Sequence, residues 1–297
     1  MRIMVIGLGQ MGLPIALNLL KAGHVVTGVD VAQESREAFA AAGGIARANT
    51  GDADAEVFIT ALASSKQVAS IYLEPKGLIA SAPKGSLFID CSTIDISLAR
   101  SLQTTACAAG HDMIDAPISG GVAAAQTGAL TIMVGGPENA FQRARPILDV
   151  IGRRIAHAGA SGAGLAVKIC NNLVVGVTIG ALSEAFALGE RLGLDPHVLF
   201  DIMSNSSGQC WALANVCPAP GVVPSAPSSN SYKPGGKTSI MLKDMRLALN
   251  ATADAEIPAP LTGAAASLYG LFAQAGGADM DCTGVFALLT GRWPGTV

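Results

Sequence analysis

Residues 3–30, IMVIGLGQMGLPIALNLLKAGHVVTGVD, contain the pattern that decides the fold of this chain. An apolar run, Ile3–Ile6, leads into a glycine-rich turn, and a helical pattern follows from Leu13 to Lys21. A second apolar run then ends at Asp30. Strand, glycine-rich turn, helix, strand and acid in this order are typical of a βαβ unit that binds a dinucleotide.

The three glycines of the turn have separate expected tasks. Gly7 allows the tight turn, Gly9 lets a pyrophosphate approach the backbone, and Gly12 lets the helix pack closely on the strand. The helix N-terminus then faces the phosphates. The alternative is a turn with only a structural role. The predicted cofactor contacts here are Gly7, Leu8, Gly9, Gln10, Met11 and Gly12.

Asp30 indicates which dinucleotide is bound. Its carboxylate would accept hydrogen bonds from the adenine ribose hydroxyls and would repel a 2′-phosphate. The residues that follow, Val31-Ala32-Gln33, supply no arginine, and Arg36 is expected about two turns into the next helix and solvated. The sequence therefore favours NAD over NADP.

Composition limits the class of protein. The chain has 297 residues, half of them hydrophobic and 14% charged, with 35 glycines, which predicts two well-buried domains. A net charge of -3 without a basic run argues against nucleic acid. The six cysteines have no metal-like spacing, so no metal site is predicted. The apolar run Leu173–Leu182 is too short for a membrane span, and a cytoplasmic location is expected.

Alternating strands and helices, among them a helix from about Ile96 to Ala108, continue to a last strand at Ile151–Ala156, followed by a joint at His157–Gly162. This predicts a Rossmann-like, doubly wound α/β domain over residues 1–161. Ligands bind beyond the carboxyl ends of parallel strands, where we expect Leu62, Ala63 and Thr93 to contact the cofactor. A helix N-cap is the alternative for Thr93. Ser119, Gly120 and Gly121 form a turn that can hold a carboxylate, although a ligand-free turn is also open.

Residues 162–172, GAGLAVKICNN, begin a helix of about 25 to 28 residues that joins this domain to an all-helical domain over residues 162–297. Lys168 and Asn172 share one face of it, four residues apart. A snorkelling lysine at a domain edge is the alternative for Lys168. Leu173–Leu182 is apolar nearly all round, which predicts a homodimer or homotetramer. The Pro-, Ser- and Gly-rich loop Cys217–Gly236 is expected to bind or gate.

Six motifs in fixed order carry a resemblance to a known family. They are GLGQMGLPIALNLLKAGH, DCSTID, DAPISGG with GALTIMVGG, GAGLAVKICNN, SSGQCW and LKDMRLAL. Together they resemble the β-hydroxyacid dehydrogenase family, and most closely its 3-hydroxyisobutyrate dehydrogenases of valine degradation. The resemblance implies Lys168 as catalytic base, Asn172 as its partner, and a substrate carboxylate at Ser119, Gly120 and Gly121. It also implies Trp211 as a pocket wall, and Lys243 and Asp244 at the cofactor and substrate. An exposed helix start is the alternative for Lys243 and Asp244.

Three departures from the family pattern affect the predicted substrate. Val216, Gly236 and Cys282 stand where relatives carry aromatics, so the pocket is expected to be roomier. The predicted reaction is NAD-dependent oxidation of a short 3-hydroxy acid, with 3-hydroxyisobutyrate giving methylmalonate semialdehyde. Serine, glycerate (or tartronate semialdehyde) and a bulkier 3-hydroxy acid remain alternatives, as does an NAD-binding sensor without catalysis.

Overall fold

The computed structural model describes residues 1–51 and 53–293 and separates into two compact units. The first comprises residues 1–168 and the second begins at Ile169. This cut falls inside one long helix, α8 (Ala163–Arg191). The α/β first domain and helical second domain are confirmed, while the boundary between residues 161 and 162 stays a prediction.

The described part of the first unit holds one sheet of strand order β3-β2-β1-β4-β5-β6-β8-β7, with β9 paired to β8. Strands β1 to β6 are parallel, whereas β8 is antiparallel to β6 and β7. The switch of direction after β6 is where the DAPISGG turn lies. The strands are β1 (Arg2–Ile6), β2 (Val25–Val29), β3 (Ile45–Arg47), β4 (Val57–Thr60), β5 (Leu87–Asp90), β6 (Asp112–Asp115), β7 (Ile118–Ser119), β8 (Leu130–Gly135) and β9 (Gly152–Gly159).

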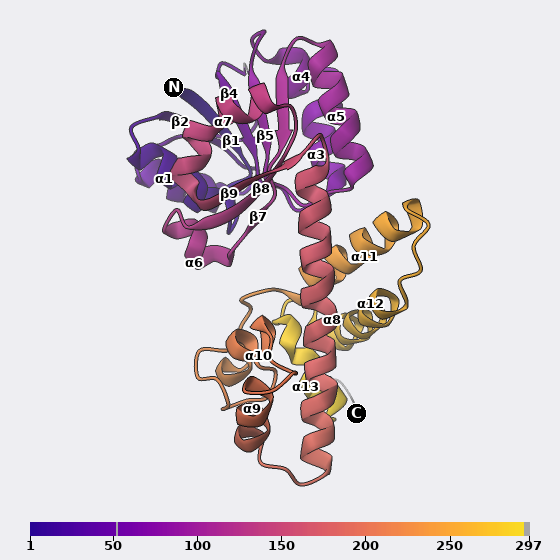
Figure 1. Ribbon diagram of the computed structural model, residues 1–297. Helices are drawn as coiled ribbons and strands as arrows, with labels where there is room; N and C mark the ends of the chain where they lie inside the picture. The colour runs from indigo at the N-terminus through magenta and orange to yellow at the C-terminus, as the bar shows by residue number, and fades with distance from the viewer. Residues whose placement is uncertain (52, 294–297) are drawn as a thin grey trace. The chain divides into compact units, whose positions relative to one another are not determined.

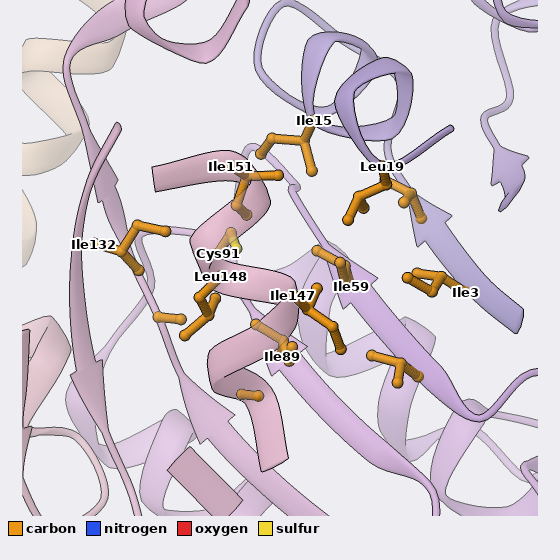
Figure 2. Packing of buried hydrophobic residues seen from close by; sticks show 14 of the residues in the cluster. Ile3, Ile15, Leu19, Ile59, Ile89, Cys91, Ile132, Ile147, Leu148 and Ile151 are labelled. Carbon is orange, nitrogen blue, oxygen red and sulfur yellow. The ribbon is translucent and has the colours of Figure 1, made fainter. Parts of the chain in front are cut away.

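Helices cover both faces of this sheet (Figure 1). Alternate strand residues point to opposite faces, so Ile3 and Val5 join one hydrophobic core and Met4 and Ile6 the other. Figure 2 shows the first core, between the strands and helices α1 and α7. The helices of this face are α1 (Gly12–Lys21), α2 (Gln33–Ala41) and α7 (Glu138–Ile151); those of the other are α3 (Ser65–Leu73), α4 (Leu78–Ser81) and α5 (Ile96–Ala108).

Strand β9 is longer than the sequence predicts and extends into the expected joint at residues 157–162. Strand β9 begins at Gly152 and continues to Gly159, because it pairs with β8 along that whole length. Residues 157–159, predicted as a glycine-rich joint, are therefore strand. Only a short turn separates β9 from the start of α8.

The second unit is helical in the described residues, as predicted. Its core gathers Met245, Tyr269, Phe272 and Phe286. The Tyr269 hydroxyl donates to the Gly176 carbonyl at 2.7 Å, which ties α12 to α8. Besides α8, the elements are α9 (Pro196–Ser204), α10 (Trp211–Val216), η1 (Pro227–Asn230), α11 (Thr238–Asp254), α12 (Pro260–Phe272), η2 (Ala273–Gly277), η3 (Cys282–Gly284) and α13 (Val285–Leu289).

Helix α8 has 29 residues and is long and apolar enough to cross a membrane by length and composition alone. A helix in the core of a folded protein can pass the same test, so a single helix of this kind is weak evidence for a membrane. Its length slightly exceeds the predicted 25 to 28 residues. The absence of proline from Ala163 to Arg191 accounts for its continuity.

The loop from Cys217 to Gly236 is held in place by hydrogen bonds to buried polar groups. The buried Ser228 hydroxyl donates to the Cys217 carbonyl at 2.6 Å. Asp281, also buried, accepts from the N–H groups of Gly235 and Gly236 at 2.9 and 2.8 Å. These bonds hold both ends of the segment that leads into α11.

Candidate active site

The glycine-rich turn has the geometry that a dinucleotide needs. Gly7 has φ +94°, and a Cβ there would lie 2.5 Å from the Ala61 carbonyl oxygen. A Cβ at Gly12 would lie 1.8 Å from the Gly7 carbonyl oxygen, so helix and turn are in backbone contact. A Cβ at Gly9 would meet no atom within 4 Å. The turn therefore leaves open space at Gly9, where a phosphate is expected.

The N-terminus of α1 adds a positive partial charge to this turn. No side chain caps α1, and its first turn contains no acidic residue. The partial charges of a helix N-terminus attract anions, and backbone N–H groups there can bind phosphate. The turn and helix together fit the pyrophosphate of a dinucleotide.

The Asp30 carboxylate is held in place at the end of β2. It accepts from the Leu8 N–H at 2.7 Å through Oδ2 and from the Ala32 N–H at 2.8 Å through Oδ1. Arg36 lies in the first turn of α2 rather than two turns into it, and its half-buried side chain donates through Nη1 to the carbonyls of Asp30 and Val31. The guanidinium therefore lies near Asp30, with its Nη1 bonded to backbone oxygens.

Leu62 and Ala63 follow β4 and are fixed by the neighbouring segments. The Leu62 N–H donates to Ser92 Oγ at 2.9 Å, and the Ala63 N–H donates to Gln67 Oε1 at 3.2 Å. The helix-cap alternative for Thr93 is wrong, because α5 begins at Ile96 and its N-cap is Asp95. A cofactor contact at Thr93 stays a prediction.

A buried polar network that could not be predicted from the sequence lies at the carboxyl ends of β4 and β5. Asp90 accepts from Thr60 Oγ1 at 2.7 Å and from the Ser92 N–H at 3.1 Å, while Thr60 also bonds the Tyr72 hydroxyl. Burial raises the pKa of Asp90 to about 6. The DCSTID motif drew attention to this segment, but no local pattern pairs it with Thr60 and Tyr72.

The predicted carboxylate turn runs from Asp115, at the end of β6, to Gly121. Ser119 pairs with Thr131 of β8, and the next residues have φ +127° at Gly120 and +69° at Gly121. Both glycine conformations are unfavourable for residues with a Cβ. Gly121 begins the short helix α6 (Gly121–Gln126). A Cβ at Gly121 would meet no atom within 4 Å, so the backbone there is open to a ligand.

Lys168 lies near the start of α8 and is only 8% exposed. A lysine is rarely buried without a functional or electrostatic reason. With Ser119–Gly121 and the dinucleotide turn, it belongs to the first unit. Asn172 follows one helical turn later and is in the second unit.

In the second unit, Asn172 and the LKDM motif are in direct contact. Asn172 Nδ2 donates to Asp244 Oδ2 at 2.7 Å, and Lys243 Nζ lies 3.4 Å from Asp244 Oδ1. Asp244 is buried, so the alternative of an exposed helix start is wrong for this residue. Asp244 therefore orients the Asn172 amide. Trp211 is the first residue of α10 and is largely exposed, so its role as a pocket wall stays a prediction.

The three positions that lack the family aromatics differ in their surroundings. Cys282 is buried, and Val216 packs against the core of the second unit. Gly236 has open space where a Cβ would be, so the missing side chain there is not replaced by a neighbour. Among residues 1–51 and 53–293, no three His, Cys, Asp or Glu side chains gather as metal ligands do.

Comparison with known proteins agrees with these features. Residues 2–159 match the profile of the NAD binding domain of 6-phosphogluconate dehydrogenase. Residues 162–289 match the profile described as NAD-binding of NADP-dependent 3-hydroxyisobutyrate dehydrogenase.

Individual relatives cover nearly the whole chain. A probable 3-hydroxyisobutyrate dehydrogenase of Mycobacterium tuberculosis is 43% identical over 290 residues, or 97% of each chain. An NAD-dependent L-serine dehydrogenase of Pseudomonas aeruginosa is 42% identical over 278 residues, or 93% of each. The solved structure of M. tuberculosis 3-hydroxyisobutyrate dehydrogenase with L-serine matches with a TM-score of 0.91 and 42% identity, over 97% of this chain and 98% of that one. This chain therefore belongs to the β-hydroxyacid dehydrogenase family of NAD-dependent oxidoreductases.

Proposed function

We propose that the protein oxidises 3-hydroxyisobutyrate, or a near homologue, to the semialdehyde with NAD+. The observation that carries this proposal is the buried Lys168, in the same unit as the open glycine-rich turn and the Ser119–Gly121 turn. The identity of 43% to a probable 3-hydroxyisobutyrate dehydrogenase supports it.

Lys168 is the proposed general base. An alcohol is a poor hydride donor until its proton leaves, so a base must contact the hydroxyl. Asn172, oriented by Asp244, would hold the amine or the hydroxyl. When bound, NAD+ supplies the hydride acceptor.

The substrate carboxylate is assigned to Ser119, Gly120 and Gly121. The serine hydroxyl and the N–H groups of the two glycines can donate hydrogen bonds to it, and the backbone is open at Gly121, where a Cβ would meet no atom within 4 Å. A carboxylate at one end and a base at the other select an acid whose hydroxyl is on carbon 3. Trp211 is the proposed apolar wall for the group on carbon 2, and Lys243 closes over substrate and cofactor.

The group on carbon 2 decides between the candidate acids. Asp115 and Asp244, the acidic residues of the DAPISGG and LKDM motifs, are already bonded, to backbone N–H groups and to Asn172, which favours the methyl of 3-hydroxyisobutyrate over the amino group of serine. L-serine is nevertheless the specific second candidate, because one relative is named for it and the solved relative contains it.

A kcat/KM panel with NAD+ over 3-hydroxyisobutyrate, L-serine and D-glycerate tests the proposal. We expect 3-hydroxyisobutyrate to rank first, with modest selectivity over close homologues, because one methylene is worth only about 1–3 kcal/mol in an apolar pocket. Serine or glycerate ranking first would overturn the substrate. No NADH from any acid, with NAD bound, would favour the sensor alternative.

We further propose a cytoplasmic homodimer or homotetramer that acts in valine degradation and prefers NAD to NADP. Asp30 supports the cofactor preference, since its fixed carboxylate would repel a 2′-phosphate. The apolar residues exposed on α8 and α9 support the oligomer. The proposed 2-methyl acid substrate supports the metabolic assignment.

A further inference from the structure

The Asp115 carboxylate joins the end of β6 to the beginning of α8. Its Oδ1 accepts from the Gly162 N–H at 2.7 Å, and its Oδ2 accepts from the Leu165 N–H at 2.9 Å. The residue is only 4% exposed, so both bonds are shielded from water. The first amides of a helix have no partner within it, and a carboxylate there is also favoured by the helix dipole. Asp115 therefore fixes where α8 begins.

Two glycines let the backbone close around this carboxylate. A Cβ at Gly135 of β8 would lie 2.5 Å from Asp115 Oδ1. A Cβ at Gly164 would lie 2.2 Å from the Met133 carbonyl oxygen. The beginning of α8 is thus in backbone contact with β8, and a close-packed joint of this kind has little freedom to shift.

Lys168 and Ser119, two residues of the proposed substrate site, are each close in sequence to the residues that Asp115 connects. Lys168 follows Leu165 by three residues on α8, less than one helical turn. Ser119 follows Asp115 by four residues and pairs with Thr131 of β8, the strand that also carries Gly135. The proposed base and the proposed carboxylate turn therefore share Asp115 as their connection.

We propose that Asp115 is a positioning residue that fixes the separation between Lys168 and the Ser119–Gly121 turn. That separation sets which carbon of the acid must carry the hydroxyl, so Asp115 determines the preference for 3-hydroxy over 4-hydroxy acids. This inference rests on the proposed roles of Lys168 and Ser119.

Asp115→Asn is the first test. Its side chain has the same shape, but its NH2 would face one of the two N–H donors, so one bond is lost. We expect kcat with 3-hydroxyisobutyrate to fall at least ~10-fold, since a misplacement of about 1 Å can cost 100-fold. The kcat/KM ratio of 3-hydroxyisobutyrate to 4-hydroxybutyrate should also fall, while the Kd for NAD stays near its wild-type value. Asp115→Glu retains both acceptors but lengthens the side chain, and should change the ratio with less loss of stability.

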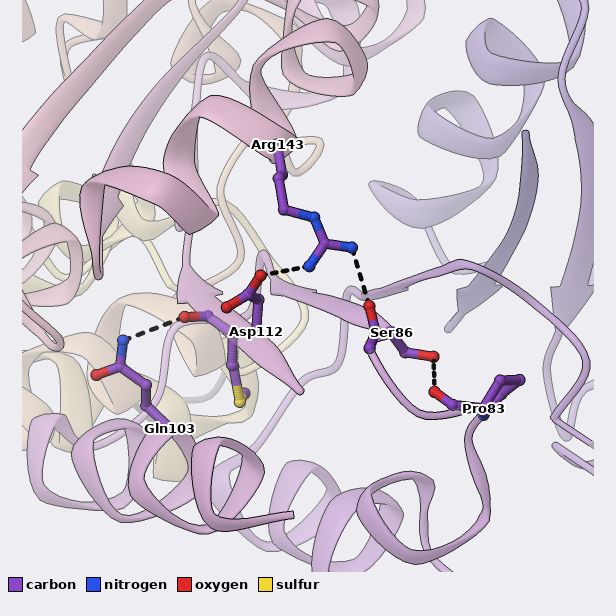
Figure 3. A network of polar contacts seen from close by, with 7 residues as sticks. Pro83, Ser86, Gln103, Asp112 and Arg143 are labelled. Carbon is purple, nitrogen blue, oxygen red and sulfur yellow. Dashed lines mark hydrogen bonds and ion pairs between the residues drawn. The ribbon is translucent and has the colours of Figure 1, made fainter. Parts of the chain in front are cut away.

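Asp112→Asn is the matched control. Asp112 begins the strand that Asp115 ends, and its carboxylate pairs with Arg143 of α7, which also donates to the Gly85 carbonyl (Figure 3). Asp112→Asn makes the same chemical change as Asp115→Asn and also removes a polar contact of β6, but it does not affect the hydrogen bonds at the start of α8. We expect the substrate ratio to remain that of the wild type.

Amide hydrogen exchange across residues 162–165 reports on the joint without reference to catalysis. Faster exchange in Asp115→Asn, together with the altered substrate ratio, supports the proposal. Faster exchange with unchanged kcat and ratio would overturn it, and so would an equal change of ratio in Asp112→Asn. Near wild-type activity in Lys168→Met would instead reject the proposed base, a failure that these measurements distinguish from failure of the joint.

Discussion

Gly9 and Gly12 offer a matched pair of single-residue substitutions in the dinucleotide turn. A methyl group at Gly9 would touch no protein atom, whereas one at Gly12 would lie 1.8 Å from the Gly7 carbonyl oxygen. We predict that Gly9→Ala keeps the melting temperature of the cofactor-free protein within about 2 °C but weakens NAD binding. Gly12→Ala should lower the melting temperature. Equal NAD affinity in Gly9→Ala and wild type, measured by calorimetry, would contradict a phosphate at Gly9.

Asp30 gives a second prediction at the scale of one side chain. Asp30→Asn combined with Val31→Arg removes the charge and adds a partner for a 2′-phosphate. Hydrogen bonds to charged groups are worth about 1.5–3 kcal/mol, so the ratio of kcat/KM for NAD over NADP should fall by roughly 10- to 100-fold. Val31→Arg alone is the control. Equal use of both cofactors by the wild type would be incompatible with the ribose assignment.

Single residues also mark where sequence reasoning stops. The roles of Gly7 and Gly12 could be predicted, because the whole motif lies within six residues. The bonds of Asp115 to Gly162 and Leu165 join residues about fifty positions apart, and the bond of Asn172 to Asp244 joins residues even more distant. Such pairs depend on how the chain folds back, which no local pattern records.

At the scale of elements, the strong periodic segments were predictable and the short ones were not. Helix α5 begins and ends where its pattern predicts, at Ile96 and Ala108. The short elements α4, α6, β3 and β7 were missed, since four residues or so contain too little of a period to recognise. Strand β9 extended beyond its apolar run because pairing with β8, not hydrophobicity, decides its end.

The buried hydrogen bond between Thr60 of β4 and Asp90 of β5 leads to a prediction about the pH dependence of stability. Burial, with a smaller contribution from the nearby Asp115 carboxylate, raises the pKa of Asp90 from 3.8 to about 6. Folding thus favours the protonated acid, so its contribution to stability is complete below about pH 4 and is lost as the pH rises through 6. Asp90→Asn cannot ionise.

The free energy of unfolding of the wild type, relative to Asp90→Asn, should therefore decrease between pH 4 and pH 7, by up to about 3 kcal/mol. Urea unfolding of both proteins at several pH values measures it. Asp54→Asn is a suitable control, since that carboxylate lies at the surface. A difference that is constant or increases with pH would show that Asp90 is ionised without cost.

At the scale of the whole molecule, the second unit exposes apolar side chains that a partner would cover. Val174 and Leu188 of α8 and Val198 and Ile202 of α9 are each about 60% exposed, and no residue of α9 is buried. We predict a dimer or tetramer by light scattering at micromolar concentration, and a lower mass for Val198→Glu with Ile202→Glu. A wild-type monomer would refute the proposed assembly.

Single-turnover hydride transfer by Lys168→Met tests the central claim most directly. The substitution keeps an unbranched side chain only one atom shorter, and so preserves most of the packing, but removes the base. General bases contribute about 10²–10⁴-fold to such steps, so transfer from 3-hydroxyisobutyrate to NAD+ should slow by that order, with the NAD Kd unchanged. The pH dependence of the remaining rate should also lose the limb that reports the base. A rate near that of the wild type, with the same pH profile, would contradict the account.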